Sequence, residues 1–167
     1  HLLALLFMPW FMLRAARSQG AQISVTGSAF VGLLAAVAVC LKPHAILAPI
    51  AIEALLLWSS RNLRAVFPPE NLAAIFFAAA YGAAIVIWTP LFLAEMLPFG
   101  VAAYVPYFGF DAAEILQRGA RPAVILALVL VLIQRAKGPM RDFAVLAFVA
   151  SAGFLAAYFL QAKGFYY

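Results

Sequence analysis

The sequence predicts an all-α bundle of membrane-spanning helices, and three observations lead to this prediction. Of the 167 residues, 68% are hydrophobic and 10% are charged, whereas soluble domains are about 45–50% apolar and about 25% charged. Long apolar runs alternate with short polar breaks that contain proline and basic residues. A soluble domain of this length has too little interior to hide so much apolar surface, so lipid is the expected solvent.

The apolar runs have the lengths that membrane spans require. A spanning helix needs about 20 mainly apolar residues, with a range of about 17–25, so we expect about six spans, the first of them truncated. The expected spans are Leu2–Leu13, Ile23–Leu41, Ala45–Trp58, Leu72–Leu93, Val124–Ile133 extended back to Pro122, and Phe143–Leu160. Because the chain starts inside an apolar run and ends abruptly, we interpret residues 1–167 as a single transmembrane domain, a fragment of a longer chain.

The breaks between these runs have a physical cause. Proline lacks an amide donor and clashes with the preceding helical turn, and a charged side chain is costly at the bilayer centre. The segment Lys42-Pro43-His44 is therefore predicted to form a hairpin turn at the membrane interface, as are residues 67–71 and 137–139. Two of these residues, Glu70 and Asn71, fall at the start of the next helix, where acidic and capping side chains are favoured.

Two features inside the expected spans indicate helix packing. Glu53 is the one acid within a predicted span, and intramembrane ionisable residues are functional candidates by default. Glu53 serves a function in one interpretation, and pairs with a neighbouring helix in the other. Membrane helices approach closely through small residues, so Ala78 and Gly82 predict the tightest helix contact.

The basic residues predict the orientation of the chain in the membrane. Loops rich in Lys and Arg stay on the cytoplasmic side. On this rule the cytoplasmic loops are short, basic and otherwise plain, and they hold Arg14, Arg17, Arg61, Arg64, Arg135, Lys137 and Arg141. The remaining four of the eleven basic residues fall on the outer face. Because the basic residues form no stripe or basic helix, no nucleic-acid partner is expected.

The most polar stretch of the outer face is residues 95–122, which we predict to be a loop with a short amphipathic helix at 112–118. Asp111 is the expected N-cap of this helix, with Glu114 at its third position. The aromatic residues before it include Tyr104 and Tyr107. They lie in the interfacial aromatic belt in one interpretation, and line a groove for a lipid or a sugar in the other.

The outer face collects the candidate binding residues. Fixed cations there suit a lipid phosphate, because arginine and lysine form charge-assisted hydrogen bonds with phosphate oxygens. The candidates for binding a lipid phosphate or a sugar are Lys42, His44, Tyr104, Tyr107, Arg118, Arg121 and Lys163. The alternative is that these cations extend from helix ends to the interface without a ligand. Two histidines and one cysteine do not match a metal-ligand spacing, so no metal site is expected in this chain.

Two segments resemble those of a known enzyme class. Leu41-Lys42-Pro43-His44 between two apolar helices, and the ending Gln161–Tyr167, are similar to bacterial membrane glycosyltransferases of the GT-C type, relatives of the dolichyl-phosphate-mannose mannosyltransferases. The resemblance implies a multi-pass enzyme of the bacterial inner membrane that transfers a sugar from a polyprenyl-phosphate donor on the outer, periplasmic face. It also implies a carboxylate, acting as a base or binding a divalent metal, in an early outer loop. That loop would precede His1, so the catalytic residue is unknown and this chain supplies no cofactor.

Two other classes of function remain open at this stage. Transporters and lipid flippases place broken helices and ionisable groups near the midplane, which the break at Lys42-Pro43-His44 and the acid Glu53 would fit. A non-catalytic membrane subunit would need no site at all. Most of the unusual polar residues lie at one face rather than near the midplane, and this favours the transferase.

Overall fold

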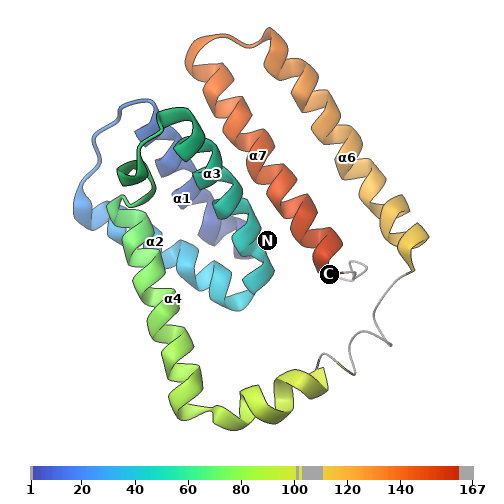
Figure 1. Ribbon diagram of the computed structural model, residues 1–167. Helices are drawn as coiled ribbons and strands as arrows, with labels where there is room; N and C mark the ends of the chain where they lie inside the picture. The colour runs from blue at the N-terminus through green and yellow to red at the C-terminus, as the bar shows by residue number, and fades with distance from the viewer. Residues whose placement is uncertain (1, 101, 103–110, 162–167) are drawn as a thin grey trace.

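The computed structural model describes residues 2–100, 102 and 111–161, and all regular structure in these ranges is helical (Figure 1). The all-α prediction is confirmed for this part of the chain. The main helices are α1 (Leu2–Ser18), α2 (Val25–Leu41), α3 (Leu47–Ser60), α4 (Pro69–Trp88), α6 (Ala112–Arg135) and α7 (Gly138–Gln161). Short 3-10 helices at Pro43–Ile46 and Leu63–Val66 precede α3 and α4, and a π-helix spans Phe92–Met96.

Three helical stretches are long and apolar enough to cross a membrane, which supports an integral membrane protein. They are Pro43–Ser60, Pro69–Trp88 and Gly138–Phe159. The helices Val25–Leu41 and Pro122–Arg135 are apolar but shorter. The larger number of spans that the sequence suggests stays a prediction.

The predicted breaks lie where helices end and begin. Helix α2 ends at Leu41, and Pro43 opens the 3-10 turn that leads into α3. Helix α4 begins at Pro69, where a missing amide donor costs nothing. Gly138 has a φ of +57° at the start of α7, a conformation that favours glycine. Proline and glycine therefore act at all three breaks as their chemistry predicts.

The helix bounds differ from the expected spans in two places. Helix α1 continues past Leu13 to Ser18, so Arg14 and Arg17 are helical rather than in a loop. Helix α4 ends at Trp88 instead of continuing to Leu93, because the residue before Pro90 is driven out of the helical conformation.

The segment 95–122 contains more helix than a loop with one short helix. The side chain of Asp111 caps α6, since its Oδ1 accepts a hydrogen bond of 2.7 Å from the amide of Glu114. This confirms the predicted N-cap. The helix then continues from Ala112 through Pro122 to Arg135, so the expected short helix forms the first turns of a longer one. Membrane helices tolerate an internal proline where neighbouring groups satisfy the freed backbone carbonyl.

The closest helix contacts are at glycines other than the predicted one. A Cβ atom built on Gly32 of α2 would overlap the carbonyl oxygen of Glu70 in α4, and one on Gly153 of α7 would lie 2.6 Å from the Cα of Ala48 in α3. By contrast, nothing lies within 4 Å of a Cβ at Gly82. The prediction that Gly82 marks the tightest contact is therefore wrong, because that part of α4 extends beyond its neighbours (Figure 1).

The hydrophobic core lies where α1, α2, α3 and α7 meet. Phe7 and Phe11 of α1 are buried beside Ile52 of α3 and Leu146 of α7. Aromatic rings reinforce the packing, since Phe7 meets Phe154 edge-on with ring centroids 5.4 Å apart. Helix α6 packs along α7 at the side of this core (Figure 1). The core thus buries one face of α1, and α1 carries the residues of the candidate site.

Candidate functional site

One face of α1 carries a series of side-chain hydrogen bonds and salt bridges to other helices. Phe7, Trp10, Arg14 and Arg17 follow one another at intervals of three or four residues, a spacing that places them on the same side of a helix. Trp10 and Arg14 are 2% and 3% exposed, respectively. A buried arginine needs acidic or carbonyl partners, and the neighbouring helices provide them.

Arg14 is held by three partners from three other segments. Its Nε and Nη2 atoms donate to the two carboxylate oxygens of Glu53 in α3, at 2.6 and 2.7 Å. Its Nη2 also donates to the backbone carbonyl of Ala65 at 2.9 Å, and its Nη1 lies 3.3 Å from Oε1 of Glu70. The paired contact with Glu53 is the geometry in which a guanidinium and a carboxylate interact most strongly.

Arg17 forms a second paired contact one turn further along. Its Nε and Nη2 atoms donate to the two oxygens of Glu70 at 2.9 and 3.0 Å, and Nη2 also donates to the hydroxyl of Ser28 in α2 at 2.9 Å. Glu70 has no solvent-exposed surface. It lies in the first turn of α4, where the helix dipole also stabilises a negative charge.

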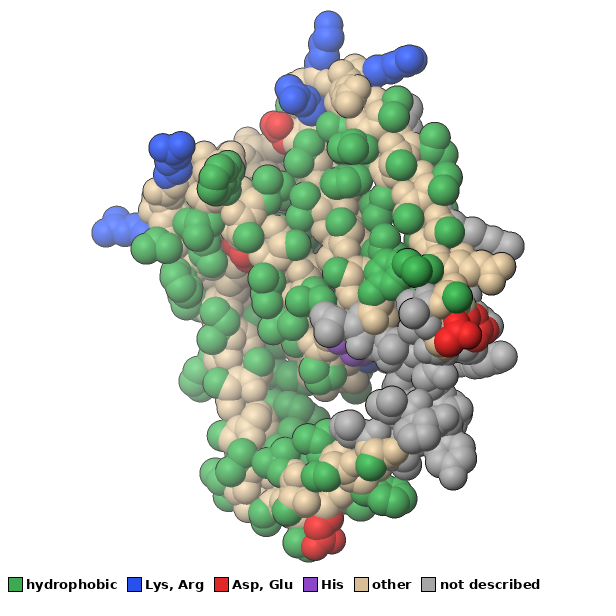
Figure 2. Space-filling view, turned by 45° about the vertical axis from the view of Figure 1, so that its right-hand side comes forward, with side chains coloured by type: hydrophobic (Ala, Val, Ile, Leu, Met, Phe, Trp, Pro, Cys, Tyr) green, Lys and Arg blue, Asp and Glu red, His purple; other side chains and the backbone are tan. Residues whose placement is uncertain are grey.

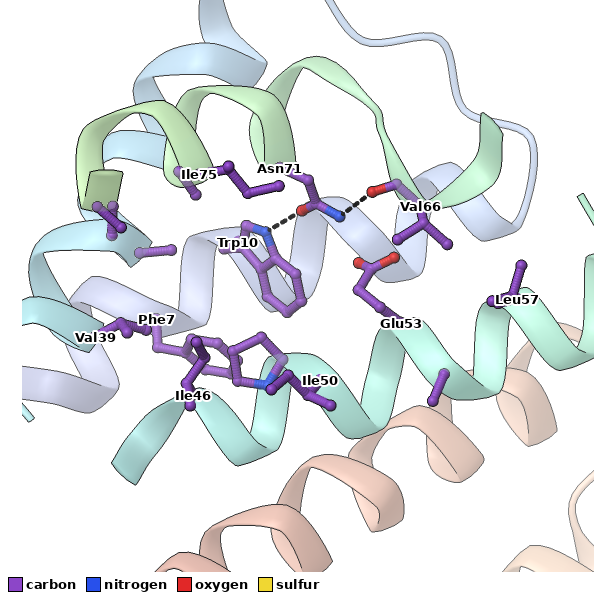
Figure 3. Close-up of a pocket in the computed structure, with 16 residues that line it drawn as sticks. Phe7, Trp10, Val39, Ile46, Ile50, Glu53, Leu57, Val66, Asn71 and Ile75 are labelled. Carbon is purple, nitrogen blue, oxygen red and sulfur yellow. Dashed lines mark hydrogen bonds between the residues drawn. The ribbon is translucent and has the colours of Figure 1, made fainter. Parts of the chain in front are cut away.

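Asn71 links the same region to Trp10. The indole Nε1 of Trp10 donates to Oδ1 of Asn71 at 2.9 Å, and Nδ2 of Asn71 donates to the carbonyl oxygen of Val66 at 2.9 Å. Figure 3 shows this chain of hydrogen bonds beside Glu53. Asn71 thereby connects α1 to the turn that precedes α4.

We refer to Arg14, Arg17, Glu53 and Glu70 as the charge network. It contains two cations and two anions, so its formal charges cancel. It joins α1 to α3 and α4, and through Ser28 to α2. Buried charges are tolerated when they are paired and hydrogen-bonded. The network therefore acts as a clamp between four helices, and both of its carboxylates are occupied by arginine.

An apolar groove of about 420 Å³ adjoins the charge network. It lies between α3 and α4, and residues of α1 and α2 also line it (Figure 3). Glu53 and Asn71 lie at one end of the groove, and Val39 and Ile46 lie toward the other (Figure 3). The remaining lining residues are Phe7, Trp10, Ala35, Ala36, Pro49, Ile50, Ala54, Leu57, Val66, Ala74, Ile75 and Ala78. Such a groove can hold an apolar chain but offers few groups for a polar ligand.

Two of the predicted binding residues belong to the break next to this groove, although neither lines it. Lys42 caps the C-terminus of α2 and His44 lies in the following 3-10 turn, and both are partly buried. Val39 and Ile46, which line the groove, flank them in sequence. The break at Lys42-Pro43-His44 thus stands at the end of the groove that is remote from Asn71.

The other predicted binding residues are only partly described. The backbones of Arg118 and Arg121 belong to α6, and Gly119 between them faces the ring of Phe159 in α7. The turn Pro43–Ile46 also contacts α7. These segments therefore share α7 as a neighbour. Tyr104, Tyr107 and Lys163 lie outside the described residues.

The charge network as a unit is not predicted from the sequence. The expectation that Arg14 and Arg17 belong to plain loops is wrong, because both lie in α1 and are paired with acids. Of the two interpretations of Glu53, pairing with a neighbouring helix is the one confirmed. The signal that could have found the network is the recurrence of Trp10, Arg14 and Arg17 at helical spacing beyond an apolar run.

Among the described residues, no group of three or more His, Cys, Asp or Glu side chains is placed to hold a metal ion. Comparisons of the chain with known protein families, with curated proteins and with solved structures found no match. Functional inference therefore rests on the groove, the charge network and the residues around them.

Proposed function

We propose that this chain is part of a multi-pass protein of the bacterial inner membrane that binds a polyprenyl-phosphate lipid. In this proposal the whole protein is a glycosyltransferase that takes its sugar from that carrier on the outer face. The observation that carries the proposal is the apolar groove between α3 and α4, with Lys42 and His44 beside one end.

The groove suits the hydrocarbon part of such a lipid. Two of its walls, α3 and α4, belong to helical stretches long and apolar enough to cross a membrane, so a lipid chain can reach it without crossing water. Small side chains such as Ala36, Ala74 and Ala78 leave room for the chain, and branched ones such as Ile50 and Ile75 supply contacts. Within lipid, selectivity for one chain over another comes from the closeness of these van der Waals contacts.

The head of the lipid would lie at the break between α2 and α3. A phosphate at this break would lie near Lys42 and His44. Both residues come just before α3, one of the helices that line the groove. An ammonium or imidazolium group binds phosphate through charge-assisted hydrogen bonds. The arrangement therefore accommodates both parts of the carrier, with the anion at the helix break and the chain between α3 and α4.

The transferase step itself rests on the resemblance of Leu41–His44 and Gln161–Tyr167 to GT-C enzymes. Glu53 and Glu70 do not serve as the base in this proposal, because each is held by arginine through two hydrogen bonds. The base, and any divalent metal it binds, would come from another part of the enzyme.

A transporter or lipid flippase is the second candidate. The paired charges of Arg14 and Glu53 within apolar helices favour it, since ionisable groups inside membranes often mark transport pathways. After reconstitution into vesicles, a transporter would move its substrate across the vesicle membrane, whereas a transferase would bind the carrier lipid without moving it.

The test is a titration of polyprenyl phosphate into the full-length protein in nanodiscs. Lys42→Ala should weaken binding by about 1.5–3 kcal/mol if the ammonium contacts the phosphate in a desolvated site, whereas Arg61→Ala at the other end of α3 should bind as the parent does. A short alkyl phosphate should bind more weakly than the polyprenyl one. If Lys42→Ala binds as tightly as the parent, the phosphate is not held at this break.

A further inference from the structure

Five exposed cations gather at one end of the helix bundle. Arg61 and Arg64 follow the end of α3, and Arg135, Lys137 and Arg141 surround the turn between α6 and α7. All five residues are exposed, and within the described part of the chain none of their side chains forms a salt bridge. We call these residues the basic end.

Helix packing places the cations that follow α3 at the same level as those around the turn between α6 and α7. Gly153 of α7 lies against Ala48 of α3, and the two helices run in opposite directions (Figure 1). From this contact α3 extends from Ala48 to Ser60 while α7 extends back from Gly153 to Arg141, an equal number of residues, so both rise about 18 Å at 1.5 Å per residue. Figure 2 shows Lys and Arg side chains collected along this upper margin.

A hydrogen bond at the same margin supports this alignment. Nε2 of Gln19, just beyond α1, donates to the carbonyl oxygen of Pro139 at the start of α7 at 3.2 Å. The ends of α1 and α3 and the start of α7 therefore lie together. The basic end is therefore one surface, formed by the end of α3, the end of α6 and the start of α7, rather than two unrelated loops.

Exposed apolar side chains next to the cations indicate how deep this surface lies. Trp58, 81% exposed, stands one turn before Arg61 in α3, and Met140, 68% exposed, precedes Arg141. Tryptophan favours the level of the lipid head groups, and arginine and lysine at helix ends extend to the same level. The five cations therefore lie where phospholipid phosphates lie.

The acids of the chain leave the basic end strongly positive. Glu53 and Glu70 are paired with the arginines of the charge network. Glu95 and Asp111 belong to the segments that connect α4 to α6, and Glu114 lies in the first turn of α6. Figure 2 shows acidic side chains at the bottom and at the right-hand margin, apart from the upper group of Lys and Arg side chains. Asp142 is the acid exposed beside the five cations.

We infer that the basic end is a binding surface for the head groups of anionic phospholipids in the leaflet that it faces. Guanidinium groups bind phosphate oxygens through paired hydrogen bonds, and cations near a membrane surface gain from its negative potential. Because the surface adjoins helices that face lipid, its occupant is a membrane phospholipid rather than a free phosphate. This inference does not depend on the carrier lipid, whose proposed site is at the other end of α3.

The test measures the preference of the reconstituted full-length protein for spin-labelled phosphatidylglycerol over spin-labelled phosphatidylcholine. The parent should prefer phosphatidylglycerol, and the preference should weaken at high salt. The variants are Arg61→Gln with Arg64→Gln, and Arg135→Gln with Lys137→Gln and Arg141→Gln. Each lost charge should lower the preference by up to about fivefold. This factor corresponds to the binding free energy that one cation gains near an anionic leaflet.

Matched variants separate this role from a structural one. Arg61→Lys with Arg64→Lys should keep the preference, because the charge remains, and Asp142→Asn should raise it. Added inorganic phosphate at constant ionic strength should leave it unchanged. An unaltered preference after loss of all five cations would overturn the inference, as would a lysine variant that loses as much as the glutamine variant or competition by inorganic phosphate.

Discussion

Two groups of arginines occupy the same end of this protein and have opposite environments. Arg14 is buried and is bound by Glu53, Glu70 and the carbonyl oxygen of Ala65, whereas Arg61 and the other cations of the basic end are exposed. In sequence both groups look alike, as basic residues that follow apolar runs. The difference is decided by acids that lie in other helices.

One charge pattern therefore serves two purposes in this protein. Arg14 and Arg17 lie on the face of α1 that meets α3 and α4, so each finds a carboxylate as the helices pack. Arg61 follows the end of its helix and is exposed. Counting cations in loops predicts the side of the membrane but gives no information about burial.

The largest expected difference between the two groups is in stability. Replacing Arg14 with methionine leaves Glu53 buried without its partner, a change that typically costs about 3–5 kcal/mol. The free energy of unfolding in detergent should fall by that amount, while Arg61→Met should leave it nearly unchanged. Equal effects of the two substitutions would mean that the charge network does not clamp the helices.

A double substitution sharpens this prediction. Arg14→Met combined with Glu53→Leu removes both charges, so it should destabilise less than the sum of the two single substitutions. Additive effects would indicate that the two side chains stabilise the protein separately, against the paired hydrogen bonds observed between them.

The next effect concerns the helix contact that brings Glu70 to the arginines. Gly32→Leu would force α2 away from the backbone of Glu70, and overpacking of this kind costs about 1–3 kcal/mol, occasionally more. Gly82→Leu, in the part of α4 with open space around it, is the matched control and should have little effect on the melting temperature in detergent. A larger loss for Gly82→Leu would contradict the packing of α2 against α4.

A smaller loss of stability is expected for the hydrogen bond between Trp10 and Asn71, because neither side chain is charged. Asn71→Leu removes the acceptor of the Trp10 indole N–H, and an unsatisfied buried donor costs about 1–3 kcal/mol. Adding Trp10→Phe should recover part of this loss in equilibrium unfolding, because the donor is then also absent. If the second substitution only adds to the first, the hydrogen bond contributes little to stability.

Much of the fold could be predicted because it depends on local chemistry. Proline and glycine at residues 43, 68–69 and 138–139 end or begin helices for reasons contained in their own backbones, and Asp111 caps α6 through a bond to an amide three residues away. Composition and run length likewise indicate apolar helices without knowledge of their neighbours.

The candidate site could not be predicted because it depends on which helices become neighbours. The two acidic partners of Arg14 lie 39 and 56 residues away in sequence, and nothing local links them to it. For the same reason Gly82 looked like a contact and Gly32 did not, although the backbone of Glu70 crosses at Gly32. Lys42 and His44 are predicted as binding residues because they interrupt an apolar run, which is a local signal, and their role stays a prediction.

The central claim is that the groove between α3 and α4 holds the hydrocarbon chain of a polyprenyl-phosphate lipid. Ala74 lines this groove, whereas Ala79 of the same helix is exposed outside it. The most direct measurement is the affinity of polyprenyl phosphate for the full-length protein in nanodiscs with each alanine replaced by phenylalanine. Ala74→Phe fills the groove and should abolish tight binding, while Ala79→Phe should bind as the parent does with a similar melting temperature. Parental affinity in Ala74→Phe would contradict the claim.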